Sequence, residues 1–137
     1  MGILPMLQQY GDIGLLALRL ALGVIFWVHG RSKWGMWKMQ PTEQMPAKMI
    51  SRMRSLSIAE PLGAVAVLLG LLTQLAAAGF CIIMLGAIWM KKRTWKTSFM
   101  STQTTGWEFD FFILGVSLAL IVLGSGSFSL DRVLLGM

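Results

Sequence analysis

One arginine lies inside an otherwise apolar segment and is the first candidate for chemistry. Arg19 stands near the middle of IGLLALRLALGVIFWV, residues 13–28. A charge at the centre of a membrane span is costly unless it is paired or reaches the surface. Asp12, Arg19 and Lys33 are spaced by multiples of seven, so they share one helix face directed at a protein interior or cavity. This position allows either an ion pair with a carboxylate that fixes packing, or a binding site for an anionic or carbonyl-bearing ligand.

Two acids, Glu60 and Glu108, each begin an apolar stretch and each follow a hydroxyl residue by three positions. Ser57 and Thr105 are those residues, and the spacing matches the capping box at a helix start. The capping interpretation makes both acids structural. The alternative is a polar cluster at one end of a helical bundle that could bind a ligand such as quinone. With Arg19, its candidate residues are His29, Lys33, Glu60 and Glu108.

The chain lacks the usual metal and catalytic residue sets. His29 is the only histidine and Cys81 the only cysteine, which excludes a Cys/His metal cage, a CxxC pair and an intrachain disulfide. Axial ligation of a haem or chlorophyll needs a single histidine, but a hydrogen-bonded interfacial His29 is the favoured interpretation. Without a Ser/His/Asp set, P-loop or dinucleotide motif, the chain is more typical of a non-catalytic subunit than of an enzyme by itself. We expect no metal.

Composition and charge placement indicate a membrane protein. Of 137 residues, 55% are hydrophobic and 13% are charged. Soluble domains contain roughly 25% charged residues. Ten of the twelve basic residues lie in two stretches between apolar runs. These are Arg31, Lys33, Lys38, Lys48, Arg52, Arg54, Lys91, Lys92, Arg93 and Lys96. Because these basic residues lie beside apolar runs, the expected partner is anionic lipid and not nucleic acid.

The apolar runs predict four spans. The run from Ile58 to Met90 would form a single helix about 50 Å long, well beyond a ~30 Å hydrocarbon core, unless it breaks near Thr73 and Gln74. The predicted spans are residues 13–28, 59–72, 75–90 and 107–123. This arrangement places both basic stretches on one face. The positive-inside rule then predicts cytoplasmic loops and both termini outside. The expected location is a prokaryotic inner membrane. We expect an all-α, four-transmembrane-helix bundle forming a single domain over residues 1–137.

A surface helix and a binding surface are predicted on the basic face. Met45, Met49, Met53 and Leu56 recur at helical spacing with basic residues between them, which predicts a cytoplasmic amphipathic helix between the first two spans. The stripe either faces lipid or packs on the bundle or on a partner protein. The residues proposed to face membrane or protein partners are Trp34, Trp37, Lys38, Lys48, Arg52 and Trp95.

Small residues within the predicted spans indicate where helices approach one another. The positions expected at helix contacts are Gly63, Ala66, Gly70, Ala76, Gly79, Gly86, Gly115 and Ala119.

Three segments and two acids together resemble the DoxX family. LRLALGVIFWVHGRSKWG, residues 18–35, is similar to that family's first span. Glu60 followed by GLLTQLAAAG, residues 70–79, is similar to its second helix and turn. Glu108 and LGSGSFSLD, residues 123–131, resemble its ending, although Ser125 replaces the usual proline. Relatives often carry a histidine after the third span, where this chain has basic residues 91–93, which weakens a metal or proton-relay role there.

The resemblance implies a four-helix membrane protein with a redox connection. Related branches supply membrane subunits of a thiosulfate:quinone oxidoreductase, or join a membrane redox complex concerned with oxidative stress and thiols. The expected function is therefore a subunit that anchors or stabilises a redox complex, with a quinone or lipid site. The alternative is a structural subunit of a respiratory or photosynthetic assembly that binds lipid or, less readily, pigment. A small transporter is disfavoured because the chain shows no inverted repeat or broken helix.

Overall fold

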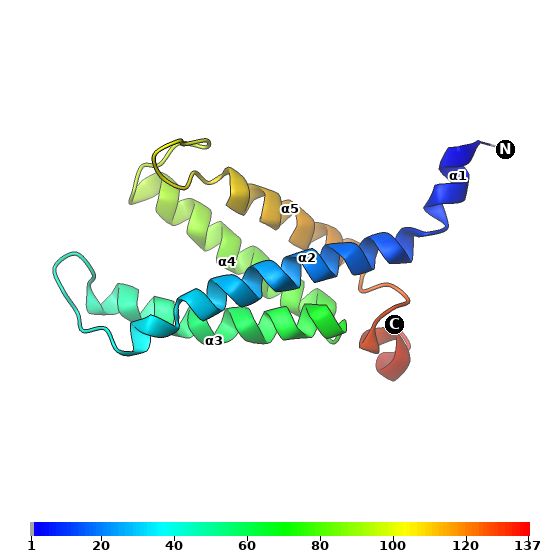
Figure 1. Ribbon diagram of the computed structural model, residues 1–137, viewed down its shortest axis with the longest axis horizontal. Coiled ribbons are helices and arrows are strands. Elements are labelled where there is room, and N and C mark those ends of the chain that lie inside the picture. The colour runs from blue at the N-terminus through cyan, green and yellow to red at the C-terminus, as the bar shows by residue number, and fades with distance from the viewer. Residues whose placement is uncertain (1) are drawn as a thin grey trace.

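Two helical hairpins form the body of the protein in the computed structural model, which describes residues 2–137 (Figure 1). The first hairpin consists of α2 (Gly11–Ser32) and α3 (Ala47–Leu69), and the second of α4 (Thr73–Arg93) and α5 (Glu108–Leu123). The shorter elements are α1 (Ile3–Gln8), the 3-10 helix η1 (Trp34–Trp37) and the π-helix η2 (Asp131–Leu135). Every regular element in residues 2–137 is helical, which confirms the all-α prediction.

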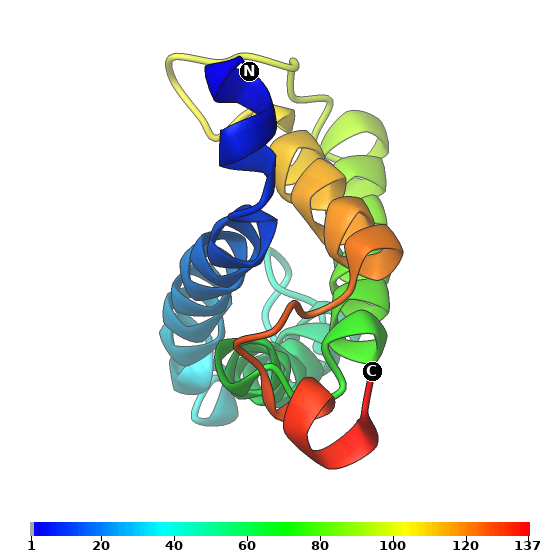
Figure 2. The same ribbon diagram turned by 90° about the vertical axis from the view of Figure 1, so that its right-hand side faces the viewer.

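The hairpins meet mainly through α3 and α4, whereas α2 and α5 touch each other little. Both hairpin loops lie at one end of the molecule, and the termini and the α3–α4 turn lie at the other (Figures 1 and 2). We call these the loop end and the terminal end. The ten basic residues of the two predicted basic stretches all belong to the loops or adjoining helix ends, so they gather at the loop end.

Two helices are long and apolar enough to cross a membrane by length and composition. They are α2 with its extension, Gly11–Trp37, and α4, Thr73–Arg93. The second helix of each hairpin differs. α3 carries Arg52, Arg54 and Glu60. α5 has 16 residues, which corresponds to about 24 Å of helix. Of the four spans that the sequence predicts, the helices therefore support two directly.

The core lies where the four long helices face each other. Leu22 and Phe26 of α2 meet Phe80 of α4, and the rings of Phe26 and Phe80 stack with centroids 3.7 Å apart. Apolar side chains on the opposite faces stay exposed, among them Ile82 at 72% and Val122 at 80%. Such an apolar exterior is what a bilayer requires, since lipid tails are as apolar as the side chains that they contact.

Close helix packing occurs at glycines, but mostly at positions the sequence did not single out. A side chain at Gly23 would overlap Leu68, and one at Gly30 would overlap the ring of Pro61, so α2 approaches α3 through these two glycines. Gly63 behaves as expected, because it faces the ring of Phe80. The predictions for Gly79, Gly86 and Gly115 were wrong, since each has open space where a Cβ would stand.

The two predicted capping boxes do not form, although α5 begins within one residue of the predicted span 107–123. α3 runs without a break from Ala47 to Leu69, so the Met-rich surface segment and the second predicted span are one helix. Ser57 therefore lies inside a helix and does not cap one. α5 begins at Glu108, and its N-cap residue, Trp107, makes no side-chain cap bond. The four apolar stripe residues from Met45 to Leu56 are half-buried, which favours packing against the chain over full exposure to lipid.

Candidate functional site

Arg19 is fully enclosed and is bound by main-chain oxygens. Its side chain is 1% exposed. The guanidinium donates to Val67 O at 2.9 Å and Leu68 O at 3.1 Å, and to Ser125 O at 3.1 Å and Phe128 O at 2.7 Å. No ion pair forms at Arg19 within residues 2–137. Of the two interpretations that the sequence left open, the ion pair with a carboxylate is therefore not formed, and these four bonds leave the guanidinium little capacity for a ligand.

The carbonyls are available because of how α3 ends. The last carbonyls of a helix have no partner in the helix and carry the negative end of its dipole. Gly70 ends α3 with a φ of +70° and brings Val67 and Leu68 to Arg19. This backbone conformation favours glycine. The C-terminal tail supplies the remaining acceptors.

The tail is held in place by Asp131, which is 1% exposed. Its carboxylate accepts hydrogen bonds from Leu72 N at 2.6 Å and Thr73 N at 3.0 Å, so it caps the start of α4. The Asp131 amide in turn donates to Gly70 O at 2.8 Å. Asp131 thus lies in the tail helix but caps α4.

Each hairpin carries one lysine–carboxylate pair near the loop end. Lys33 Nζ lies 2.7 Å from Glu60 Oε2 in the first hairpin, and also donates to His29 O at 3.1 Å. Lys91 Nζ lies 2.5 Å from Asp110 Oδ2 in the second hairpin. Glu60 and Asp110 are both buried. The Lys33–Glu60 pair holds the end of α2 against α3, and the Lys91–Asp110 pair holds α4 against α5.

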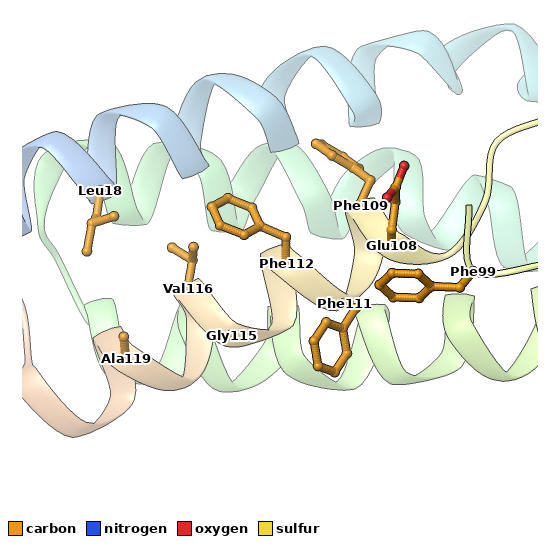
Figure 3. Close-up of a pocket in the computed structure, with 9 residues that line it drawn as sticks. All are labelled: Leu18, Phe99, Glu108, Phe109, Phe111, Phe112, Gly115, Val116 and Ala119. Carbon is orange, nitrogen blue, oxygen red and sulfur yellow. The ribbon is translucent and has the colours of Figure 1, made fainter. Parts of the chain in front are cut away.

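An open groove runs along the side where α2 and α5 have little contact. Its volume is about 780 Å³, and its residues come almost entirely from α5. They are Leu18, Phe99, Glu108, Phe109, Phe111, Phe112, Gly115, Val116 and Ala119. Figure 3 shows Phe109 and Phe112 directed from α5 toward α2, and Leu18 directed from α2 toward Val116. Glu108 is the acid in this lining and stands at the loop end of the groove.

His29 connects the first hairpin to this groove. Its ring stacks on Phe109 with centroids 5.9 Å apart and an interplanar angle of 23°. The imidazole is exposed, as is Glu108. Of the residues predicted to cluster, Glu108 lines the groove and His29 contacts the lining residue Phe109, whereas Lys33 and Glu60 pair between α2 and α3. Arg19 lies apart, toward the terminal end.

The aromatic residues of the first loop are tied to α3. Trp34 Nε1 donates to Ser57 O at 3.1 Å, and Trp37 Nε1 donates to Ser57 Oγ at 2.9 Å. Arg54 donates to Met36 O at 3.0 Å and lies over the Trp37 ring at 5.6 Å. These roles of Ser57 and Arg54 were not predicted from the sequence. The capping-box pattern at Ser57 predicted a helix cap, whereas Ser57 accepts hydrogen bonds from two tryptophans. The other proposed surface residues, Lys38, Lys48, Arg52 and Trp95, are exposed.

Comparison with known proteins identifies the family. The DoxX family pattern matches residues 14–93, which covers α2, α3 and α4. The chain is also 33% identical over 126 residues to a protein of Bacillus subtilis (strain 168) named "Putative oxidoreductase CatD", covering 88% of this chain and 86% of that protein. No solved structure matches the chain. The chain belongs to the DoxX family of membrane proteins.

Proposed function

We propose that this chain is a membrane subunit of a redox assembly and that the groove between α2 and α5 binds a quinone. The groove is the observation that carries the proposal, because its apolar, aromatic lining ends in one acid, Glu108, at the loop end. Ligand sites are mostly apolar, with a few polar groups that orient the ligand. A quinone has the same division between a polar ring and an apolar tail.

The groove residues suit the two ends of such a molecule. The His29 imidazole can donate a hydrogen bond to a quinone carbonyl, and the Glu108 carboxylate can accept one from a quinol hydroxyl. Phe109 and Phe112 provide surfaces on which a flat ring can stack. Beyond them, Val116 and Leu18 line a path for an isoprenoid tail within the hydrocarbon region.

Electrons and protons for quinone reduction would come from a partner. The chain itself offers no redox motif. The Bacillus subtilis relative is named a putative oxidoreductase. The proposed docking surface is the loop end, where Lys38, Lys48, Arg52 and Trp95 are exposed. Trp and Arg are enriched at binding hot spots. Trp34 and Trp37 support this surface by fixing the loop on α3.

The proposal includes a specific membrane arrangement. α2, α3, α4 and α5 would each cross the inner membrane of a prokaryote, with the loop end in the cytoplasm and both termini outside. Ten basic residues gather at the loop end, and the positive-inside rule therefore supports this orientation. Residues 1–137 would act as a single membrane domain.

The alternative is a structural subunit whose groove holds a lipid chain, or less readily a pigment. The observation that favours it is the groove's openness along its side together with a lining in which Glu108 is the charged residue. An acyl chain needs no polar partner there. The two proposals differ in whether His29 and Glu108 matter to the ligand.

A photoreactive quinone with an isoprenoid tail tests the groove. We expect it to label α5, and we expect Val116→Trp, which fills the groove, to abolish labelling. Leu118→Trp is the matched control, because Leu118 is exposed on α5 outside the groove. His29→Phe keeps the ring stacked on Phe109 but removes the N–H donor. Equal labelling of the Val116→Trp and Leu118→Trp variants would refute the site, and labelling unaffected by His29→Phe and Glu108→Gln would favour the lipid alternative.

The partner requires a separate test. Purification of the tagged chain from its membranes in mild detergent should retain a redox protein. Lys48→Glu with Arg52→Glu should release that protein and leave the helical content unchanged. Quinone-linked oxidoreductase activity of the purified chain alone would contradict the subunit role.

A further inference from the structure

A second cavity, of about 430 Å³, lies at the terminal end and is polar where the groove is apolar. Its polar lining side chains come from three parts of the chain: Asp12 of α2, Gln74 of α4, and Ser125, Ser127, Asp131 and Arg132 of the tail. It thus joins two carboxylates, a guanidinium, an amide and two hydroxyls in one pocket. None of these groups takes part in the proposed quinone site.

The pocket lies at the depth of lipid headgroups. The two candidate membrane spans both begin at this end, at Gly11 and at Thr73. Asp12 and Gln74 are the second residues of those spans. The pocket therefore sits where hydrocarbon gives way to headgroups, whichever side of the membrane this end faces.

The walls of the pocket are fixed by hydrogen bonds that leave opposite charges available. Ser127 Oγ donates to Asp12 Oδ2, and Gln74 Nε2 donates to Ile121 O at 2.6 Å. Asp131 is occupied in capping α4. Within residues 2–137, the Arg132 side chain makes no hydrogen bond or ion pair, and it is exposed at the rim. A ligand with an ammonium group near an anionic group would meet Asp12 and Arg132 together.

A recess lined by leucines and glycines, with Gln8 and Gln9 at its edge, continues from the pocket. It has a volume of about 600 Å³ and shares Asp12, Leu15 and Leu123 with the polar pocket. Leu18 lines its far part and also belongs to the α2–α5 groove. A small soluble zwitterion would leave this recess empty, whereas a lipid would place an acyl chain in it.

We propose that this pocket binds an aminophospholipid of the phosphatidylethanolamine type. Its primary ammonium donates hydrogen bonds to the Asp12 carboxylate, its phosphate pairs with Arg132, and one acyl chain follows the recess past Leu15. Phosphatidylcholine lacks N–H donors for Asp12, and phosphatidylglycerol offers no cation. The pocket therefore selects among lipids by headgroup chemistry, independently of the quinone proposal.

Native mass spectrometry of the full chain tests this selection. The protein is extracted from vesicles of equal parts phosphatidylethanolamine, phosphatidylcholine and phosphatidylglycerol, and the retained lipids are counted. We expect one preferentially retained phosphatidylethanolamine. Asp12→Asn and Arg132→Gln should each weaken its retention about tenfold, the scale of one lost charge-assisted hydrogen bond. Asn keeps an acceptor for Ser127, and Arg132 is exposed, so both variants should fold.

Lys48→Gln with Arg52→Gln is the control, since these exposed cations lie at the loop end. It should reduce phosphatidylglycerol retention and leave phosphatidylethanolamine unchanged. Equal retention of the three lipids, or phosphatidylethanolamine retention that Arg132→Gln does not reduce, would overturn the proposal. If Asp12→Asn lowers helical content, the Arg132→Gln result decides.

Discussion

At the scale of single residues, Arg19 shows how a buried charge can be held by main-chain carbonyls without a contacting carboxylate. Four carbonyl oxygens from α3 and the tail surround its guanidinium. Hydrogen bonds to a charged donor are stronger than neutral ones. The side chain therefore joins α2, the end of α3 and the tail at one point.

Arg19→Leu should lower the free energy of unfolding by about 3 kcal/mol or more, because it leaves buried carbonyls without donors. Arg31→Leu is the matched control, since Arg31 is an exposed arginine on the same helix. Denaturant titration in detergent, followed by circular dichroism, measures both. An Arg19→Leu variant as stable as the control would show that these hydrogen bonds contribute nothing net.

Lys33 and Glu60 should prove energetically coupled. Glu60 is 2% exposed and pairs with Lys33. Lys33→Met therefore leaves a buried carboxylate without its partner and should cost about 2 kcal/mol or more. Glu60→Gln should cost a similar amount, and the double variant less than the sum of the two. Thermal unfolding of all four proteins gives the coupling energy, and additive losses would argue against the pair.

At the scale of elements, the two hairpins are held in similar ways but touch through different surfaces. Each has a lysine–carboxylate pair near its loop. Only the first has glycines at the helix contact, where Gly23 and Gly30 allow α2 to approach α3. The residue that Gly30 accommodates is Pro61, which lies inside α3.

Gly30→Ala would bring a new methyl group into overlap with the Pro61 ring. It should destabilise the protein by about 1–3 kcal/mol, the usual cost of overpacking. Gly86→Ala in α4 is the matched control, because its Cβ meets open space. That substitution should be neutral or stabilise by up to about 1 kcal/mol. Denaturation midpoints of the two variants in one detergent make the comparison. A Gly30→Ala variant as stable as Gly86→Ala would show that α2 can move away from α3 at little cost.

Sequence patterns predicted the helices better than their ends and contacts. Apolar runs located α2 and α4. The partners of Arg19 could not be read from the sequence, because carbonyl oxygens are present in every residue. The capping box at Ser57 failed because packing of α3 against α2 and the first loop extends the helix past that local signal.

At the scale of the whole molecule, the two ends differ in their number of basic residues. The loop end carries ten basic residues, whereas Arg132 is the one Lys or Arg in the terminal tail. Bilayer contact is expected of the family, and this charge difference can orient the chain.

Single cysteines at Gly2 and Lys48, in a Cys81→Ala background, should react from opposite sides of the membrane with an impermeant thiol reagent. Lys48 should be labelled only after the membrane is permeabilised. Gly2 should react in intact cells, because the proposed arrangement places the N-terminus outside. Labelling of both positions from one side would contradict the four-span arrangement.

The isolated chain should contain no stoichiometric metal. Residues 2–137 hold no group of three or more His, Cys, Asp or Glu side chains arranged to bind a metal ion. Elemental analysis of protein purified without chelators measures this directly. One equivalent of zinc, iron or copper per chain would refute the prediction.

The placement of the Arg19 acceptors has a consequence for biosynthesis. Ser125 and Phe128 follow Arg19 by 106 and 109 residues, so the ribosome makes them long after α2. Until they emerge, Arg19 has only the end of α3 to bind, and the α4 start lacks Asp131 as its cap. α2 must therefore enter the membrane with its arginine incompletely satisfied, which favours delayed release from the insertion machinery until the tail arrives. The surroundings of Arg19 are therefore complete only after Ser125 and Phe128 have been translated.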